Sequence, residues 1–165
     1  MRKFEVANGF ENKGINLPIR ATKNAAGYDF EAAKDILIKS VHTTDMGLTV
    51  EELLSGMPKY LKPTLVPTGI KADMEDDEAL MLYNRSSNPK NGLILANGVG
   101  VVDSDYYSNP DNDGHIMFAF VNIGRKDYIV KKGDRIGQGV FQKFLLTEDD
   151  ISVGTRISGF GSTGK

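Results

Sequence analysis

The segment from Gly98 to Tyr106 (GVGVVDSDY) places a carboxylate where acid–base chemistry is feasible. Asp103 follows the apolar run 99–102, so a strand would carry it from an apolar wall into the turn that begins at Ser104. Partial burial makes a carboxylate a better base than full solvation does, so Asp103 is a candidate general base. On local sequence alone, a turn-initiating Asp is the commoner alternative. Asp105 is the nearby competitor for this role.

Two other segments offer groups that suit phosphate oxygens. Arg85, Ser86 and Ser87 follow the apolar run 79–83 and place a cation and two hydroxyls at a strand end. Gln138 closes the sequence GDRIGQ, and its amide could donate to a phosphate or accept from water. A capped turn and a hairpin corner are the alternatives for these two segments in isolation.

A single carboxylate and a C-terminal aromatic complete the candidates. Asp29, in AGYDF (26–30), could orient a metal-bound water or close a network with another segment. Phe160 stands alone among small residues in the tail 156–165 (RISGFGSTGK), where its ring could stack on a base. The backbone and hydroxyl groups of Gly161 and Ser162 could meet a phosphate. Without other signals, such a tail is expected to be a disordered end.

The sequence predicts that β-strands position these groups. Apolar or β-branched runs alternate with turns rich in Gly, Asn, Asp or Pro, which predicts an all-β jelly roll or related distorted barrel. The runs are 36–41, 64–70, 79–83, 93–102, 115–123, 128–130 and 139–146. The exception is 47–60, where Thr49 and Glu52 have capping-box spacing and one short helix is expected.

Composition narrows the function classes. A chain of 165 residues is long enough for one compact domain. The net charge of −2 does not favour sequence-independent binding to the nucleic-acid backbone. No apolar run reaches the length of a membrane span, so a soluble cytoplasmic protein is expected. Without cysteine and with only two histidines, a metal would be a hard ion bound by oxygen, such as Mg²⁺.

Taken in order, AGYDF, RSS, NGVGVVDSDY, GDRIGQ and RISGFGSTG resemble the five motifs of the trimeric dUTP pyrophosphatases (dUTPases), of a bacterial or phage type with an insertion. The resemblance runs from about residue 15 to residue 165. It implies a dUTPase-type β domain over 1–155 and an arm over 156–165 that closes over the nucleotide.

The resemblance also implies a reaction and a division of roles. Asp103 would activate a water that attacks the α-phosphorus of dUTP, giving dUMP and pyrophosphate with the help of Mg²⁺. The hairpin around Asn97 would read uracil, with Tyr106 beneath the deoxyribose. The implied substrate-binding set is Arg85, Ser86, Ser87, Asn97, Gly98, Val101, Val102, Tyr106, Met117, Gln138, Arg156, Phe160, Gly161 and Ser162. Asp29 would act on the metal through water, and three subunits would share each site in a homotrimer.

The chain departs from the family pattern in three places. An insertion of about 40–61 would be a surface flap, a trimer contact or a site for another protein. The loop that begins at Tyr107 is longer than usual. Arg156 lies four positions before Phe160, one fewer than is common, which bears on how far Arg156 reaches.

Two alternative functions stay open at this point. A dCTP deaminase or bifunctional relative would share the fold but needs a glutamate near the base, and the run HIMFAFVNI at 115–123 has none. A dUTP-sensing regulatory protein would act through the insertion.

Overall fold

The computed structural model describes residues 1–42, 62–152 and 154. Within these ranges the regular elements are β-strands and short 3₁₀ turns, so the all-β prediction is confirmed. No helix in this part of the chain is long and apolar enough to cross a membrane. The helix expected within 47–60, most of the 40–61 insertion and the arm 156–165 lie outside the described residues.

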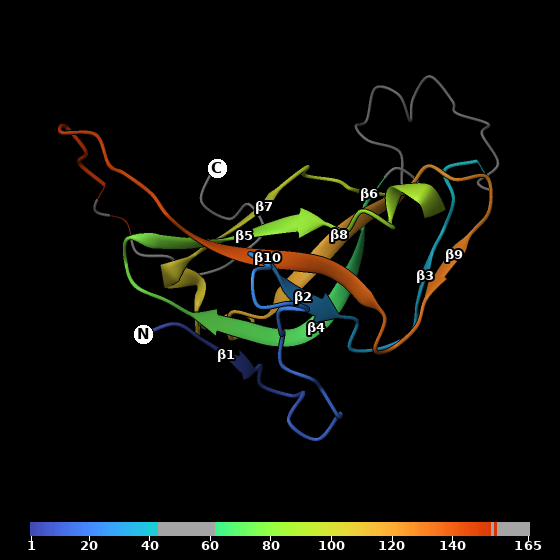
Figure 1. Ribbon diagram of the computed structural model, residues 1–165, viewed down its shortest axis with the longest axis horizontal. Coiled ribbons are helices and arrows are strands. Elements are labelled where there is room, and N and C mark those ends of the chain that lie inside the picture. Colours follow the sequence, from blue (N-terminus) through green and yellow to red (C-terminus); the bar gives the residue numbers. More distant parts are fainter. Residues whose placement is uncertain (43–61, 153, 155–165) are drawn as a thin grey trace.

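Two four-stranded antiparallel sheets and one strand pair make up the fold (Figure 1). The first sheet has the spatial order β1 (Lys3–Val6), β4 (Thr64–Asp73), β8 (Ile116–Asn122), β6 (Leu93–Leu95). The second has the order β2 (Tyr28–Glu31), β10 (Arg135–Lys143), β5 (Glu78–Asn84), β7 (Gly100–Asp103). The pair is β3 (Ile36–Ile38) with β9 (Tyr128–Val130), and the 3₁₀ turns are η2 (Pro89–Asn91) and η3 (Ser104–Tyr106).

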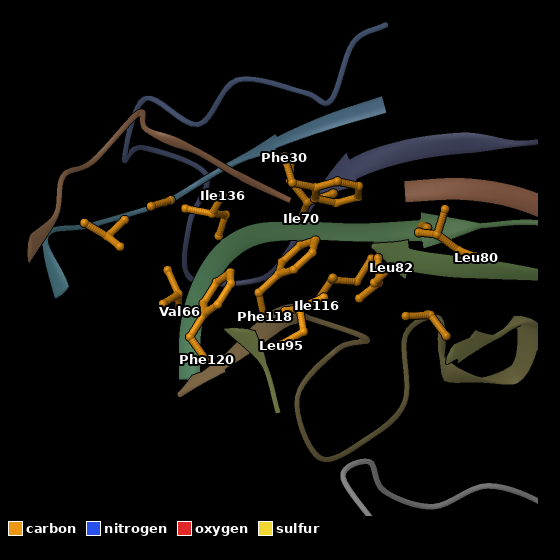
Figure 2. Packing of buried hydrophobic residues seen from close by; sticks show 14 of the residues in the cluster. Phe30, Val66, Ile70, Leu80, Leu82, Leu95, Ile116, Phe118, Phe120 and Ile136 are labelled. Atoms are coloured by element: carbon orange, nitrogen blue, oxygen red, sulfur yellow. The ribbon is translucent and has the colours of Figure 1, made fainter. Parts of the chain in front are cut away.

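The core lies between the two four-stranded sheets. Burial alternates along β8, where Phe118 and Phe120 are 1% exposed and the residues between them are half-buried. Figure 2 shows Phe118 facing Phe30 from the second sheet, and their ring centroids are 5.7 Å apart. Strand periodicity thus directs every second side chain into one shared core.

Gly137 on β10 lies directly against the Phe118 ring of the first sheet. A Cβ atom at this position would lie 2.0 Å from the Phe118 ring, so only glycine leaves room for the aromatic core. The close approach fixes where β10 crosses β8. It therefore also fixes Gln138, which follows Gly137 and points to the opposite face of the sheet.

Most predicted runs coincide with strands, with two exceptions. The run 93–102 is divided between β6 and β7, which belong to different sheets, by a turn in which Gly98 has φ +70°. β10 ends at Lys143, so the apolar residues after it are not part of the strand. β1 was not among the predicted runs, because it is four residues long and half of them are charged.

Candidate active site

Three predicted site residues, Asp29, Arg85 and Gln138, gather with Arg135 where β2, β10 and the end of β5 meet, and we call these four residues the arginine cluster. Asp29 and Gln138 are directly paired across β2 and β10. The Asp29 carboxylate lies 3.4 Å from Arg85 Nε and 3.1 Å from Arg135 Nη1, and its side chain is only 15% exposed. Asp29 therefore holds two guanidinium groups side by side.

The side-chain amide of Gln138 is held in place by its neighbours. Its Nε2 donates to the carbonyl of Asn84 at 3.4 Å. A Cβ atom at position 27 would lie 2.4 Å from Gln138 Oε1, so Gly27 is needed to let the amide lie against this backbone. The glycine of the AGYDF segment thus makes room for the amide of the GDRIGQ segment.

The turn that carries the two serines is tied to the body by the buried side chain of Asn88 and the half-buried Asn84. Asn88 Nδ2 donates to Asn84 Oδ1 at 2.6 Å and to the carbonyl of Ile136 at 2.7 Å. Ser86 and Ser87 are exposed on this turn, with both hydroxyls accessible to a ligand. A pocket of about 360 Å³ borders the turn and is lined in part by Arg85, Ser87 and Arg135.

A second group lies on the hairpin between β6 and β7. Asn97 and Gly98 are exposed at the turn, and Val101 is 58% exposed, whereas Val102 belongs to the core. Asp103 is half-buried at the end of β7, opposite Ala79 of β5. It is the N-cap residue of η3, and its side chain makes no capping hydrogen bond to that turn.

Two further predicted site residues, Tyr106 and Met117, lie on η3 and β8. Tyr106 ends η3 and is 7% exposed, and its hydroxyl donates to the carbonyl of His115 at 3.1 Å. Met117 is half-buried on β8, opposite Pro67 of β4.

The two groups share one face of the second sheet but stand apart along it. Cross-strand pairs put Gln138 beside Tyr83 and Asp103 beside Ala79, both on β5. Four residues of strand separate Tyr83 from Ala79, which is about 14 Å. The structure thus brings the phosphate candidates together and brings Asp103 together with the hairpin, but it does not join the two groups within one chain.

Between the two groups the same face is apolar. Val140, Met81 and Val101 form a cross-strand row on β10, β5 and β7, which we call the apolar row. Beyond β10, Leu145 is 96% and Leu146 is 69% exposed, in a segment that extends away from the body in Figure 1. Apolar side chains in such positions are typical of surfaces that another chain covers.

Sequence reasoning gave no role to Arg135 or to the asparagines of the turn. The arginine is visible within GDRIGQ, but its contact with Asp29 depends on the pairing of β2 with β10, which no local pattern reveals. In the described part of the chain, no group of three or more His, Cys, Asp or Glu residues is placed to hold a metal. The predicted Arg156, Phe160, Gly161 and Ser162 lie outside the described residues.

Comparisons with known proteins identify the family of this chain. The sequence profile of the family described as dUTPase matches residues 57–164. The deoxyuridine 5'-triphosphate nucleotidohydrolase of Lactococcus lactis subsp. lactis (strain IL1403) is 44% identical over 99% of this chain and 98% of its own length. The enzyme of that name from Desulfitobacterium hafniense (strain DSM 10664 / DCB-2) is 35% identical over 98% of this chain and 96% of its own.

Solved structures show the same fold. The crystal structure of the Streptococcus mutans dUTPase has a TM-score of 0.71 and 39% identity, covering 88% of this chain and 98% of that one. The dUTPase of the Staphylococcus aureus phage phi11 has a TM-score of 0.65 over 98% of this chain and 99% of its own, and at 14% identity it supports the fold alone. With a family match over most of its length and close relatives over nearly all of it, this chain belongs to the dUTPase family.

Proposed function

We propose that this protein hydrolyses dUTP to dUMP and pyrophosphate, with Asp103 as the general base. The carboxylate takes a proton from water as the water oxygen bonds to the α-phosphorus, and the bond from that phosphorus to the bridging oxygen breaks to release pyrophosphate. A positioned base of this kind contributes about 10²–10⁴ in rate. The reaction keeps uracil out of DNA and supplies dUMP for thymidylate synthesis.

The position of Asp103 is the observation that carries this proposal. The residue ends a strand whose hairpin is open to a ligand at Asn97, Gly98 and Val101, and Asp103 itself is half-buried. A uracil ring bound by the hairpin would therefore have the Asp103 carboxylate a few residues away along the same strand. This is the geometry that base recognition followed by attack at the α-phosphorus requires.

The hairpin and Tyr106 would select the nucleoside. Backbone groups from Gly98 to Val102 would pair with the edge of uracil, because a mismatched edge leaves buried polar groups unpaired. The methyl group of thymine would meet the walls of the same tight pocket. Tyr106 would pack beneath the deoxyribose and leave no space for a 2′-hydroxyl. Met117, on the neighbouring strand, would contribute to this pocket.

The arginine cluster and the exposed serines would bind the triphosphate. Arg85 and Gln138 are held by neighbours on three strands, and Ser86 and Ser87 project beside them. Such a set offers charge-assisted and neutral donors to phosphate oxygens. Arg156 and Phe160 of the arm would close over the γ-phosphate and the base, together with Gly161 and Ser162.

Magnesium fits this set only as a partner of the substrate. The described residues provide no carboxylate cluster of their own, so the phosphates and water would supply most ligands, with Asp29 orienting a bound water. Asp29 already binds two arginines, but a carboxylate has about four acceptor positions, which leaves room for such a water. Mg²⁺ would neutralise charge on the phosphates.

Complete sites would form in a homotrimer, between subunits. Gln138 and Asp103 are offset by about 14 Å along β5 and lie on the strands to either side of it, β10 and β7, whereas the general base and the phosphate ligands must all reach one triphosphate. The hairpin of one subunit and the arginine cluster of another would satisfy this condition. The apolar row and the exposed leucines after β10 provide surface for such contacts.

A substrate panel tests the reaction. With Mg²⁺ present, we expect hydrolysis of dUTP to exceed that of dCTP, dTTP and UTP by orders of magnitude in kcat/KM. Asp103→Asn should lower kcat for dUTP by about 10²-fold or more, because it keeps the shape and removes the base. Asp105→Asn, on the exposed neighbour, is the matched control and should retain activity.

Three results would contradict the proposal. Equal turnover of the four nucleotides would contradict the role of the hairpin in recognising uracil. An Asp103→Asn enzyme that keeps its activity would contradict the role of Asp103 as the general base. Release of ammonia from dCTP would favour the deaminase alternative instead.

A further inference from the structure

The loop after Tyr106, from Tyr107 to Gly114, is built around its own side chains, and we call it the 107–114 loop. Ser108 and Asp113 adopt the left-handed backbone conformation with φ of 53° and 60°, which non-glycine residues rarely do. A Cβ atom on Gly114 would lie 2.6 Å from the carbonyl oxygen of Tyr106. Such a conformation persists only where surrounding contacts determine it.

Asn109 fills the inside of this loop. The residue is 6% exposed, and its Nδ2 donates to the carbonyl of Tyr106 at 2.9 Å and to Asn112 Oδ1 at 2.8 Å. Its Oδ1 accepts the backbone N–H groups of Asp111 and Asn112. One buried amide thus links the start of the loop to its middle.

An ion pair anchors the far end of the loop to the first sheet. Lys71 Nζ on β4 lies 2.9 Å from Asp113 Oδ2, and the two side chains are 11% and 15% exposed. Asp113 also accepts the backbone N–H of Asn8 at 2.8 Å, and Lys71 Nζ lies 4.9 Å from the centre of the Tyr107 ring. Charges this well buried are stable only while paired, so they hold the loop in one position.

The loop reaches the Tyr106 hydroxyl through Asn112. Asn112 Nδ2 donates to that oxygen at 2.7 Å, while the hydroxyl proton goes to the carbonyl of His115 at 3.1 Å. Asn112 Oδ1 is itself fixed by Asn109 and by the backbone N–H of Gly114. The far end of the tyrosine ring is therefore held from two sides.

We propose that Asn112 is a positioning residue that sets the selection of deoxyribose over ribose by fixing Tyr106. This inference rests on the proposed function, in which Tyr106 packs beneath the sugar. A ring held at its hydroxyl cannot tilt to admit a 2′-hydroxyl, because tilting breaks both hydrogen bonds. The 107–114 loop thereby acts on specificity without touching the nucleotide.

The test compares kcat/KM for dUTP with kcat/KM for UTP. Asn112→Ala should lower the dUTP/UTP ratio by about five- to tenfold, the effect of one neutral hydrogen bond, mainly by raising turnover of UTP. Asn112→Asp should retain most of the ratio, since the tyrosine hydroxyl can turn its proton toward the new carboxylate. Tyr106→Phe, which keeps the ring and leaves the loop intact, should lower the ratio as Asn112→Ala does.

A double variant separates positioning from general damage. If Asn112 acts through the hydroxyl, Asn112→Ala should change the ratio no further in a Tyr106→Phe background. Asn91→Ala is the matched control, because its Nδ2 lies 3.5 Å from the hydroxyl of another tyrosine, Tyr128. Asn91 belongs to η2, the yellow-green coil in Figure 1, and η3 is the yellow coil at the opposite end of the molecule.

Each outcome of these measurements supports or contradicts the proposed role of Asn112. An unchanged ratio in Tyr106→Phe, or additive losses in the double variant, would overturn it even if Asn112→Ala folds poorly. A wild-type protein that turns over dUTP and UTP equally would instead refute the proposed function. A wild-type protein that prefers dUTP and an Asn112→Ala variant that does so equally would refute the positioning role alone.

Discussion

His115 is a half-buried histidine whose neutral form the fold requires. Its Nε2 accepts the backbone N–H of Gly69 at 2.9 Å, and its ring lies 4.7 Å from that of Phe10. Burial lowers the pKa of His115 to about 4. An imidazolium has no lone pair for Gly69, so protonation would break the hydrogen bond.

This shift predicts a loss of stability in mild acid. The unfolded chain binds the proton near pH 6.5 and the folded chain only near 4, so the stabilisation is complete above 6.5 and is lost as the pH falls toward 4. The loss is on the order of 2 kcal/mol, allowing for the part of the ring that solvent reaches. Urea unfolding at pH 7 and pH 4.5 measures it.

His115→Gln is the control for this prediction. Its amide oxygen can accept from Gly69 without titrating, so the variant should lose less stability between pH 7 and 4.5 than the wild type. The same pH dependence in both proteins would assign the loss to other groups.

At the level of single residues, the sequence predicts which side chains could do chemistry better than it predicts which side chains are in contact. Asp103 could be recognised because an apolar run directly precedes it and because the other motifs stand in order around it. The second cation on Asp29 could not, since Arg135 is 106 positions away and meets it only through strand pairing. Asn112 carries no local signal either, because its role depends on a loop that folds back on Tyr106.

At the scale of elements, β1 is held to the second sheet by a buried charge. Glu78, at the start of β5, is 1% exposed, and its carboxylate accepts hydrogen bonds from Arg2 and from the backbone N–H of Glu75. The hydrogen bond from Arg2 lowers the pKa of Glu78 below its usual value. The guanidinium group thus stabilises the ionised form and ties the chain before β1 to β5.

Arg2→Ala should therefore lower the Tm by several degrees at neutral pH, because it leaves a buried carboxylate without its cation. Arg2→Ala with Glu78→Gln should recover part of the loss, since a neutral amide needs no cation. The stabilisation is present above the ordinary pKa of glutamate and disappears as the pH falls through the lowered one, so the variants should converge in strong acid. Calorimetry across this range measures the effect, and equal Tm values at pH 7 would refute it.

Strand positions follow from periodicity, whereas their sheet partners do not. The run 93–102 is predicted as one apolar run, yet its two halves pair with β8 and β5 in different sheets. The break falls at Asn97-Gly98, a dipeptide typical of turns, where Gly98 has φ +70°. Sequence patterns therefore locate the hairpin that would read the base, but not the sheets that support it.

At the scale of the whole molecule, the second sheet keeps the arginine cluster and Asp103 at a fixed separation. Gly137 against Phe118 and the continuous pairing of β10 with β5 fix the arginine cluster relative to Asp103. A packed sheet does not stretch or fold by 14 Å on binding a ligand. If both groups act on one dUTP, they must come from different copies of the chain.

Mixing two inactive variants tests this division. Asp103→Asn lacks the base and Gln138→Ala lacks a phosphate donor, so each homotrimer should be impaired. In trimers co-refolded from equal amounts, about a quarter of the sites would take Asp103 from one variant and Gln138 from the other, given cyclic symmetry. We therefore expect the mixture to recover about a quarter of the wild-type kcat.

The control pairs two variants of the same cluster, Gln138→Ala and Asp29→Asn. Because both changes affect the half of the site that one chain contributes, every mixed site carries one defect, and no activity should return. Recovery in the first mixture and none in the second would require that Asp103 and the arginine cluster act across a subunit boundary. Failure of the first mixture, with mixed trimers verified by tagged subunits, would instead mean that one chain supplies both groups and that the sheet rearranges when dUTP binds.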